Sequence, residues 1–94
     1  MERVCYKGIL AELEERPDSL SLVMVPENTP EDRWGDPMEQ FVFHVGEATR
    51  FAFPPEELRR GMTLTIGHNG IATRSLPPQG NALFVLCTNE PARA

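Results

Sequence analysis

The sequence predicts a mainly β protein, a small antiparallel barrel of five to six strands with one short helical turn. Two observations predict this class: short stretches of alternating apolar and polar residues recur along the chain, and clusters rich in Gly, Pro, Asn and Asp separate them. A chain of 94 residues builds only one hydrophobic core, so residues 1–94 are expected to form a single domain. Disorder is expected only at the ends, as in residues 89–94.

The first half of the chain predicts three strands. Residues 4–14 are rich in β-branched and aromatic side chains, and Gly8 interrupts them where a long, curved strand would bulge or bend. Pro, Asp and Ser within residues 14–19 favour a hairpin connection. Residues 19–25 and 40–45 alternate in polarity, which is typical of half-buried strands. Their predicted inward side chains are Leu20, Leu22, Met24, Phe41, Phe43 and Val45.

The stretch between these strands, residues 26–37, predicts a long surface loop, because its three prolines and four acidic residues exclude a regular element. It contains the only tryptophan, Trp34, next to Arg33. An exposed tryptophan leaves much apolar area in water, so we expect Trp34 to fold back over the open end of the barrel. The alternative is that Trp34 anchors a partner.

A short helical turn is predicted for residues 54–61, after Phe51 and Phe53 continue the apolar face. Prolines and glutamates suit the start of a helix, and Gly61 suits the left-handed conformation at its end. Leu58 is expected to anchor the turn in the barrel.

The last part of the chain predicts a hairpin and a final strand. Residues 62–68 alternate in polarity, and Asn69–Gly70 is the dipeptide most favoured in two-residue hairpin turns, so residues 71–75 are the predicted return strand. Residues 76–81 then cross to the strand 82–87, which is apolar on both faces and is expected to be covered on both sides. The predicted inward residues of 62–68 are Met62, Leu64 and Ile66.

This arrangement is close to the oligonucleotide/oligosaccharide-binding (OB) architecture, since it combines a bent first strand with a helical turn before the penultimate long strand. Residues 56–82 also resemble the closing half of a group of short bacterial proteins known only as domains of unknown function. The resemblance rests on a Leu-x-x-Gly turn, a strand, a turn with Gly and a Ser-x-Pro-x-Gln signature, which correspond to Leu58, Gly61, Gly70, Ser75, Pro77 and Gln79. It implies an OB-like barrel and no established activity. Many members carry an export signal and a lipid-anchor cysteine, and this sequence has neither.

The charge balance bears on partners. A formal net charge of −5 repels a phosphate backbone, so nucleic acid is not the expected partner. The expected partner is an unidentified protein or small ligand. Single-stranded nucleic-acid binding stays as the alternative, because OB-like barrels serve it, although the phenylalanines alternate as core residues rather than as exposed stacking platforms. A self-complementary edge would also allow a homo-oligomer.

The location in the cell is expected to be cytoplasmic, because no apolar run approaches a membrane span and the first residues lack the apolar core of a secretion signal. Export is the alternative if a native signal has been removed. Cys5 and Cys87 are expected to be reduced packing residues, with a disulfide between them only in an exported protein.

No catalytic or metal chemistry is expected. Cys5, His44, His68 and Cys87 have suitable ligand atoms for zinc but not the usual short spacing. No Gly-x-Ser-x-Gly elbow is present, and the paired carboxylates lie in turns, loops or a helix start, where solvation or capping explains them. We therefore predict that the protein is not an enzyme and has no cofactor.

The leading hypothesis is a noncatalytic binding or protein-interaction module. OB-like barrels bind ligands on a strand face and its bordering loops, which directs attention to the loop 31–37 and to outward side chains. His44 lies opposite Phe41 and Phe43 in the alternation and is expected to face solvent. The candidate binding residues are Trp34, Arg33, His44, Arg50 and Arg74.

Overall fold

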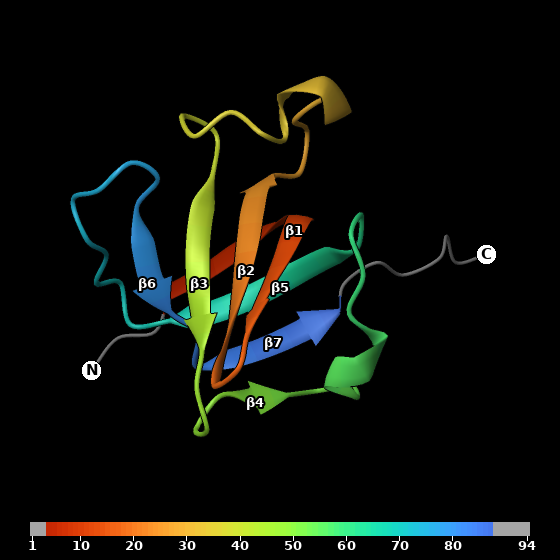
Figure 1. Cartoon of the computed structure of the whole chain (residues 1–94), viewed down its shortest axis with the longest axis vertical. Coiled ribbons are helices and arrows are strands. Elements are labelled where there is room, and N and C mark those ends of the chain that lie inside the picture. The colour runs from red at the N-terminus through yellow and green to blue at the C-terminus, as the bar shows by residue number, and fades with distance from the viewer. Residues whose placement is uncertain (1–3, 88–94) are drawn as a thin grey trace.

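The computed structural model describes residues 4–87 of the chain and is mainly β, as predicted (Figure 1). In the described part, seven strands form one sheet in the order β4-β7-β5-β1-β2-β3-β6. Two 3-10 turns, η1 and η2, interrupt the loops. The elements are β1 (Val4–Arg16), β2 (Ser19–Pro26), η1 (Glu31–Arg33), β3 (Phe41–Val45), β4 (Arg50–Phe51), η2 (Pro55–Glu57), β5 (Thr63–His68), β6 (Gln79–Asn81) and β7 (Phe84–Cys87). The C-terminal segment 89–94, expected to be disordered, lies outside the described residues.

Strand β1 is the longest strand and belongs to both halves of the sheet, because it pairs antiparallel with β2 and with β5. The predicted irregularity is present, but the register shifts between Leu10 and Glu12 rather than at Gly8. Glycine is needed at position 8 for a different reason, because a Cβ there would overlap the carbonyl oxygen of Val25 on β2. The glycine therefore permits close approach of two backbones, and the bulge at Ala11 bends the strand.

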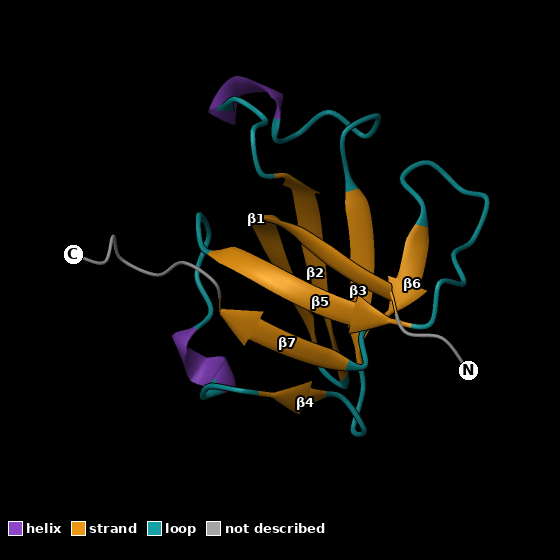
Figure 2. Ribbon diagram, turned by 180° about the vertical axis from the view of Figure 1, so that it is seen from behind, coloured by secondary structure: helices purple, strands orange, loops and turns teal. Residues whose placement is uncertain are grey.

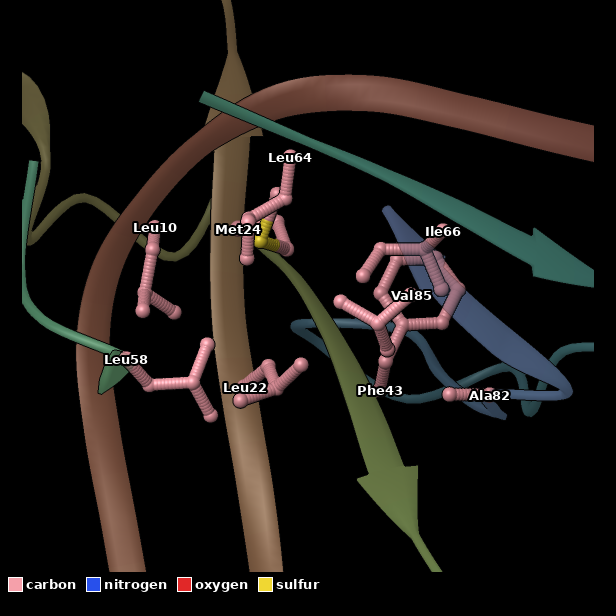
Figure 3. Close-up of a cluster of buried hydrophobic side chains, with 9 residues drawn as sticks. All are labelled: Leu10, Leu22, Met24, Phe43, Leu58, Leu64, Ile66, Ala82 and Val85. Atoms are coloured by element: carbon pink, nitrogen blue, oxygen red, sulfur yellow. The ribbon is translucent and has the colours of Figure 1, made fainter. Parts of the chain in front are cut away.

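The main core lies between two crossing layers, with β1, β2 and β3 on one side and β5 and β7 on the other (Figures 1 and 2). Of the predicted inward residues, Leu22, Met24, Phe43, Leu64 and Ile66 are completely buried. The others are partly buried against the same core: Leu20, Phe41, Val45 and Met62. Leu58 is buried at the end of η2, which confirms it as the anchor of that turn. Figure 3 shows the buried side chains together, and the full cluster is Leu10, Leu22, Met24, Phe43, Leu58, Leu64, Ile66, Ala82 and Val85.

The predicted hairpin at Asn69–Gly70 is wrong. Residues 71–75 form no strand, and the chain leaves β5 as a loop. Both edges of β5 are already paired, with β1 and β7, so a return strand would have no free edge. A two-residue type I′ turn needs positive φ at both central residues. Gly70 has a positive φ of 84°. Asn69 does not, because among the described residues only glycines have positive φ.

The final part of the chain forms two short strands instead of one. Strand β6 pairs parallel with β3, and β7 pairs antiparallel with β5 and parallel with β4, so the sheet is mixed rather than wholly antiparallel. Only Ala82 and Leu83 separate β6 from β7. The prediction that this strand is covered on both sides is wrong, because Leu86 and Cys87 are exposed and no described element covers them.

The described part of the chain contains no helix with the length and apolar character needed to cross a membrane.

Candidate functional site

The outer face of β1, β2 and β3, opposite the main core, has an apolar floor of its own. Ala11, Val23, Val25 and Val42 form a second buried cluster there, and Trp34 packs against it. The loop between β2 and β3 thus folds back onto the sheet, as predicted, but it covers the outer sheet face rather than the open end of a barrel. The physical reason is that the outward residues of β2 are apolar and need cover.

Several contacts fix Trp34 in this position. Its indole Nε1–H donates to the carbonyl of Thr29 at 3.0 Å, and its own carbonyl accepts from Nε2 of Gln40 at 2.8 Å. The guanidinium of Arg60 lies over the ring, 4.7 Å from its centroid. Arg60 is in turn held by the carbonyl of Ala11 at 3.0 Å and by Glu31 at 3.3 Å. Trp34 is therefore half-buried and held in place by contacts within the chain, so its side chain is not freely available to anchor a partner.

Two hollows open on this face on either side of Glu12. The first, about 290 Å³, has Val23 and Val42 in its lining and polar side chains around them, among them Glu12, Glu14, Gln40, His44 and Gln79. The second, about 270 Å³, is lined by Ala11, Glu12, Trp34, Gly35 and Arg60. Both hollows include Glu12, and we call the two together the outer trough. It runs from Trp34 and Arg60 to His44 and Gln79.

The charges along the outer trough are unevenly compensated. Glu14 lies 3.8 Å from Arg16, and Arg60 lies 3.3 Å from Glu31. Glu12, at the junction of the two hollows, is exposed and makes no ion pair with another described residue. The trough therefore has one uncompensated negative charge near its middle.

His44 is half-buried, which corrects the prediction that it faces solvent. Its Nδ1 lies 2.9 Å from Oγ of Ser21, and its Nε2 lies 2.8 Å from Oε1 of Gln79. An amide oxygen can only accept, so Nε2 carries a proton in this arrangement, and in the neutral imidazole Nδ1 accepts from the serine hydroxyl. The order of groups resembles that of a nucleophile, a base and an orienting residue. Ser21 is completely buried, however, so its hydroxyl cannot meet a substrate, and the chain of bonds ties β2, β3 and β6 together.

The other predicted binding residues lie outside the outer trough. Arg33 pairs with Glu39 at 3.1 Å and with Asp36 at 3.5 Å within its own loop. Arg50 is exposed on β4, which lies at the opposite edge of the sheet from β6, and Arg74 is exposed in the loop before β6. The structure thus brings Trp34 and His44 to the outer trough, and does not bring Arg50 or Arg74 to it.

Sequence reasoning missed Glu12, Glu14 and Gln40 as residues of the site. A signal for the first two was present, because Glu12, Glu14 and Arg16 alternate with the partly buried Leu13 and so share the outer face of β1. Gln40 precedes β3 and gave no signal, since its position depends on how the Trp34 loop returns to the sheet.

Two titratable side chains with shifted pKa values lie against the main core, away from the outer trough. Burial raises the pKa of Tyr6 to about 12, and the negative charge of Glu39 adds to this. Desolvation lowers the pKa of His68, whose ring centroid lies 5.2 Å from that of Phe43. Burial against the phenylalanines of β3 is the main cause of both shifts.

The cysteines are free and exposed, which corrects the prediction that they pack inside. Cys5 on β1 and Cys87 on β7 lie on strands that flank β5. Two strand spacings amount to roughly 9.5 Å, beyond the Cα separation that a disulfide spans. Across residues 4–87, no group of three or more His, Cys, Asp or Glu side chains gathers in a way that could hold a metal ion.

No known protein-family model matches the chain, and no curated protein matches it. The resemblance of residues 56–82 to the short bacterial proteins stays a prediction.

Proposed function

We propose that this protein is a noncatalytic binding module that takes its ligand in the outer trough. One observation carries the proposal: two hollows on a single sheet face share Glu12, and Trp34 lines one of them while His44 lines the other. Both residues are held by hydrogen bonds, so the trough is formed before a ligand arrives. A preformed site loses little conformational freedom on binding.

An OB-like barrel is the architecture we propose for this module. The support lies in the last two strands, which only Ala82 and Leu83 separate. If β6 and β7 act as one bent strand, pairing passes from β5 through β1, β2 and β3 to β6–β7 and back to β5. The N–H groups of Ala82 and Leu83 donate to the carbonyls of His44 and Gly67, on β3 and β5, at 2.9 and 2.7 Å. OB-like barrels bind ligands on a strand face and its bordering loops, and the outer trough occupies such a place.

We propose that the protein is cytoplasmic, because two exposed thiols that cannot form a disulfide with each other stay reduced in a reducing compartment.

Heteronuclear NMR tests the proposed function. The 15N-labelled protein is titrated with pools of capped peptides, oligonucleotides and small metabolites. At least one pool is expected to shift amide signals at Glu12, Gln40 and Gln79 in a saturable way, because these residues line the trough. A saturable turnover of any pool member, or the absence of shifts with every pool, would refute the proposal.

A pair of variants on β1 gives the control. Glu14→Phe fills the first hollow and should abolish the shifts, because Glu14 lines it. Glu15→Phe makes the same change one residue away, where the side chain is exposed and lies outside both hollows, and should leave binding unchanged. Equal effects of the two variants would place the binding site elsewhere.

Single-stranded nucleic-acid binding is the alternative, and Trp34 is the observation in its favour, because an aromatic ring at the edge of an OB-like face can stack on a base. Arg60 covers that ring, however, and Phe41 and Phe43 pack in the main core. Fluorescence anisotropy with labelled oligonucleotides at low salt tests it. Saturable binding that Trp34→Ala removes would establish this alternative.

A further inference from the structure

We infer that the occupant of the outer trough is an extended peptide segment that places a Lys or Arg side chain beside Glu12. This inference rests on the proposed function and names the class of ligand. It is carried by charge complementarity, by solvent-exposed amide atoms on the trough wall that bond to no other described residue, and by the dimensions of the sheet face.

Charge complementarity comes from Glu12. The other charged side chains that line the trough, Glu14, Arg16 and Arg60, have partners of opposite charge among the described residues, whereas Glu12 has none. Glu12 also lies where the two hollows meet, so a ligand that fills both must pass it. A single cationic group near the middle of the ligand is the complement of this arrangement.

The chain itself shows how this surface holds a guanidinium. Arg60 stacks over Trp34, donates from Nε to the carbonyl of Ala11 and pairs through Nη1 with Glu31. The aromatic face and Glu31 are therefore already used by the chain's own cation. A second cation is directed to Glu12, which lines the same hollow as Trp34 and Arg60.

The wall of the first hollow offers hydrogen bonds of the kind that a peptide backbone makes. Gln79 uses Oε1 to accept from His44, and Gln40 uses Nε2 to donate to the carbonyl of Trp34. The other amide atoms, Nε2 of Gln79 and Oε1 of Gln40, make no hydrogen bond with another described residue. One donor and one acceptor thus face a ligand that carries C=O and N–H groups.

The dimensions fit a short extended segment. The first hollow spans the sheet from β1 to Gln79 on β6, across β2 and β3. Three strand spacings amount to roughly 14 Å, and an extended peptide rises about 3.3 Å per residue, so roughly four residues lie across the first hollow. Glu12 on β1 lies at the end of this span, and the peptide continues past it into the second hollow. A nucleic acid of that length would bring its phosphates against Glu12 and Glu14, which repel them.

Pools of short capped peptides test this inference. The pools are identical except at the central position, which is Arg, Lys, Gln or Glu, and neutral residues fill the other positions. Binding is followed by NMR shifts and by the emission of Trp34, the only tryptophan of the chain. We expect the Arg and Lys pools to bind, the Gln pool to bind more weakly and the Glu pool not to bind, with affinity falling as salt is added.

Variants of β1 identify the residue responsible. Glu12→Gln keeps the shape of the side chain and should weaken binding of the Arg pool by about tenfold, the value of one charge-assisted contact. Glu15→Gln removes the same charge from the same strand outside the trough and should have no effect. The unchanged Trp34 emission of both free variants establishes that they are folded.

The outcomes separate this inference from the proposed function. Equal binding of the Arg, Gln and Glu pools at the trough, or binding that Glu12→Gln leaves unchanged, would refute the inference of a cationic peptide ligand. The proposal that the protein is a binding module would be unaffected. Trough shifts with oligonucleotides or metabolites but with no peptide pool would do the same. No shift with any pool would overturn both.

Discussion

Replacement of Gly67 by alanine tests how the last strand packs on the sheet. Gly67 on β5 lies opposite Phe84 on β7 in an antiparallel pair. A Cβ added to Gly67 would overlap three carbons of the Phe84 ring, so the ring lies directly over the glycine. Gly67→Ala must therefore push the ring aside, and overpacking of this kind costs about 1–3 kcal/mol. Without the ring, alanine would be favoured over glycine in a strand by roughly 0.5–1 kcal/mol.

The assay is urea unfolding followed by Trp34 emission, applied to Gly67→Ala, Phe84→Ala and the double variant. The cost of Gly67→Ala is expected to vanish or reverse in the Phe84→Ala background, which gives a coupling free energy of about 1–3 kcal/mol. Gly46→Ala is the control, because a Cβ at Gly46 meets no atom within 4 Å. If Gly67→Ala costs the same with and without the Phe84 ring, the ring is not what requires the glycine.

Three further predictions concern stability and titration. Tyr6 is the only tyrosine, so its phenolate absorbance should titrate near pH 12 rather than 10, and Glu39→Gln should lower that pKa. The raised pKa of Tyr6 contributes stability that is present below pH 10 and is lost as pH rises from 10 to 12. His68 has a lowered pKa in the folded protein, so its contribution to the free energy of unfolding should be fully present above about pH 6.5. As the pH falls below that value, the free energy of unfolding should decrease by at most about 1.4 kcal/mol per pH unit. His68→Gln should flatten that slope in urea unfolding at several pH values, and an unchanged slope would contradict this. Leu22→Ala should cost about 2–5 kcal/mol in the same assay, because Leu22 is completely buried, and a cost below 1 kcal/mol would mean that the site collapses or is not core.

The core was predictable because alternation is a local property that the tertiary structure preserves. Leu22 and Met24 on β2 and Leu64 and Ile66 on β5 face inward in the sequence pattern and are completely buried in the structure. A strand that places one residue inward places its neighbours i ± 2 inward as well. The pattern therefore fixes which side chains form the core, although it does not fix which strands pair.

Strand pairing was less predictable, because it depends on which edges are free. Asn69–Gly70 favours a hairpin by local turn chemistry, but β1 and β7 occupy both edges of β5. The chain therefore continues through a loop to β6, which joins β3 instead. The parallel pairing of β6 with β3 and of β4 with β7 has no local sequence signature, since parallel partners lie far apart along the chain.

The outer trough was hidden for the same reason, yet the sequence does carry one sign of it. Three successive residues of β2 that point away from the main core, Ser21, Val23 and Val25, carry no charge. An outward face open to water would be expected to carry polar and charged residues, as Glu12 and Glu14 do on β1. All three are buried, because the Trp34 loop covers part of this face and His44 bonds to Ser21. Strand β2 therefore forms an apolar floor next to the acidic side chains of β1, and this combination on one face lines the hollow that we propose as the binding site.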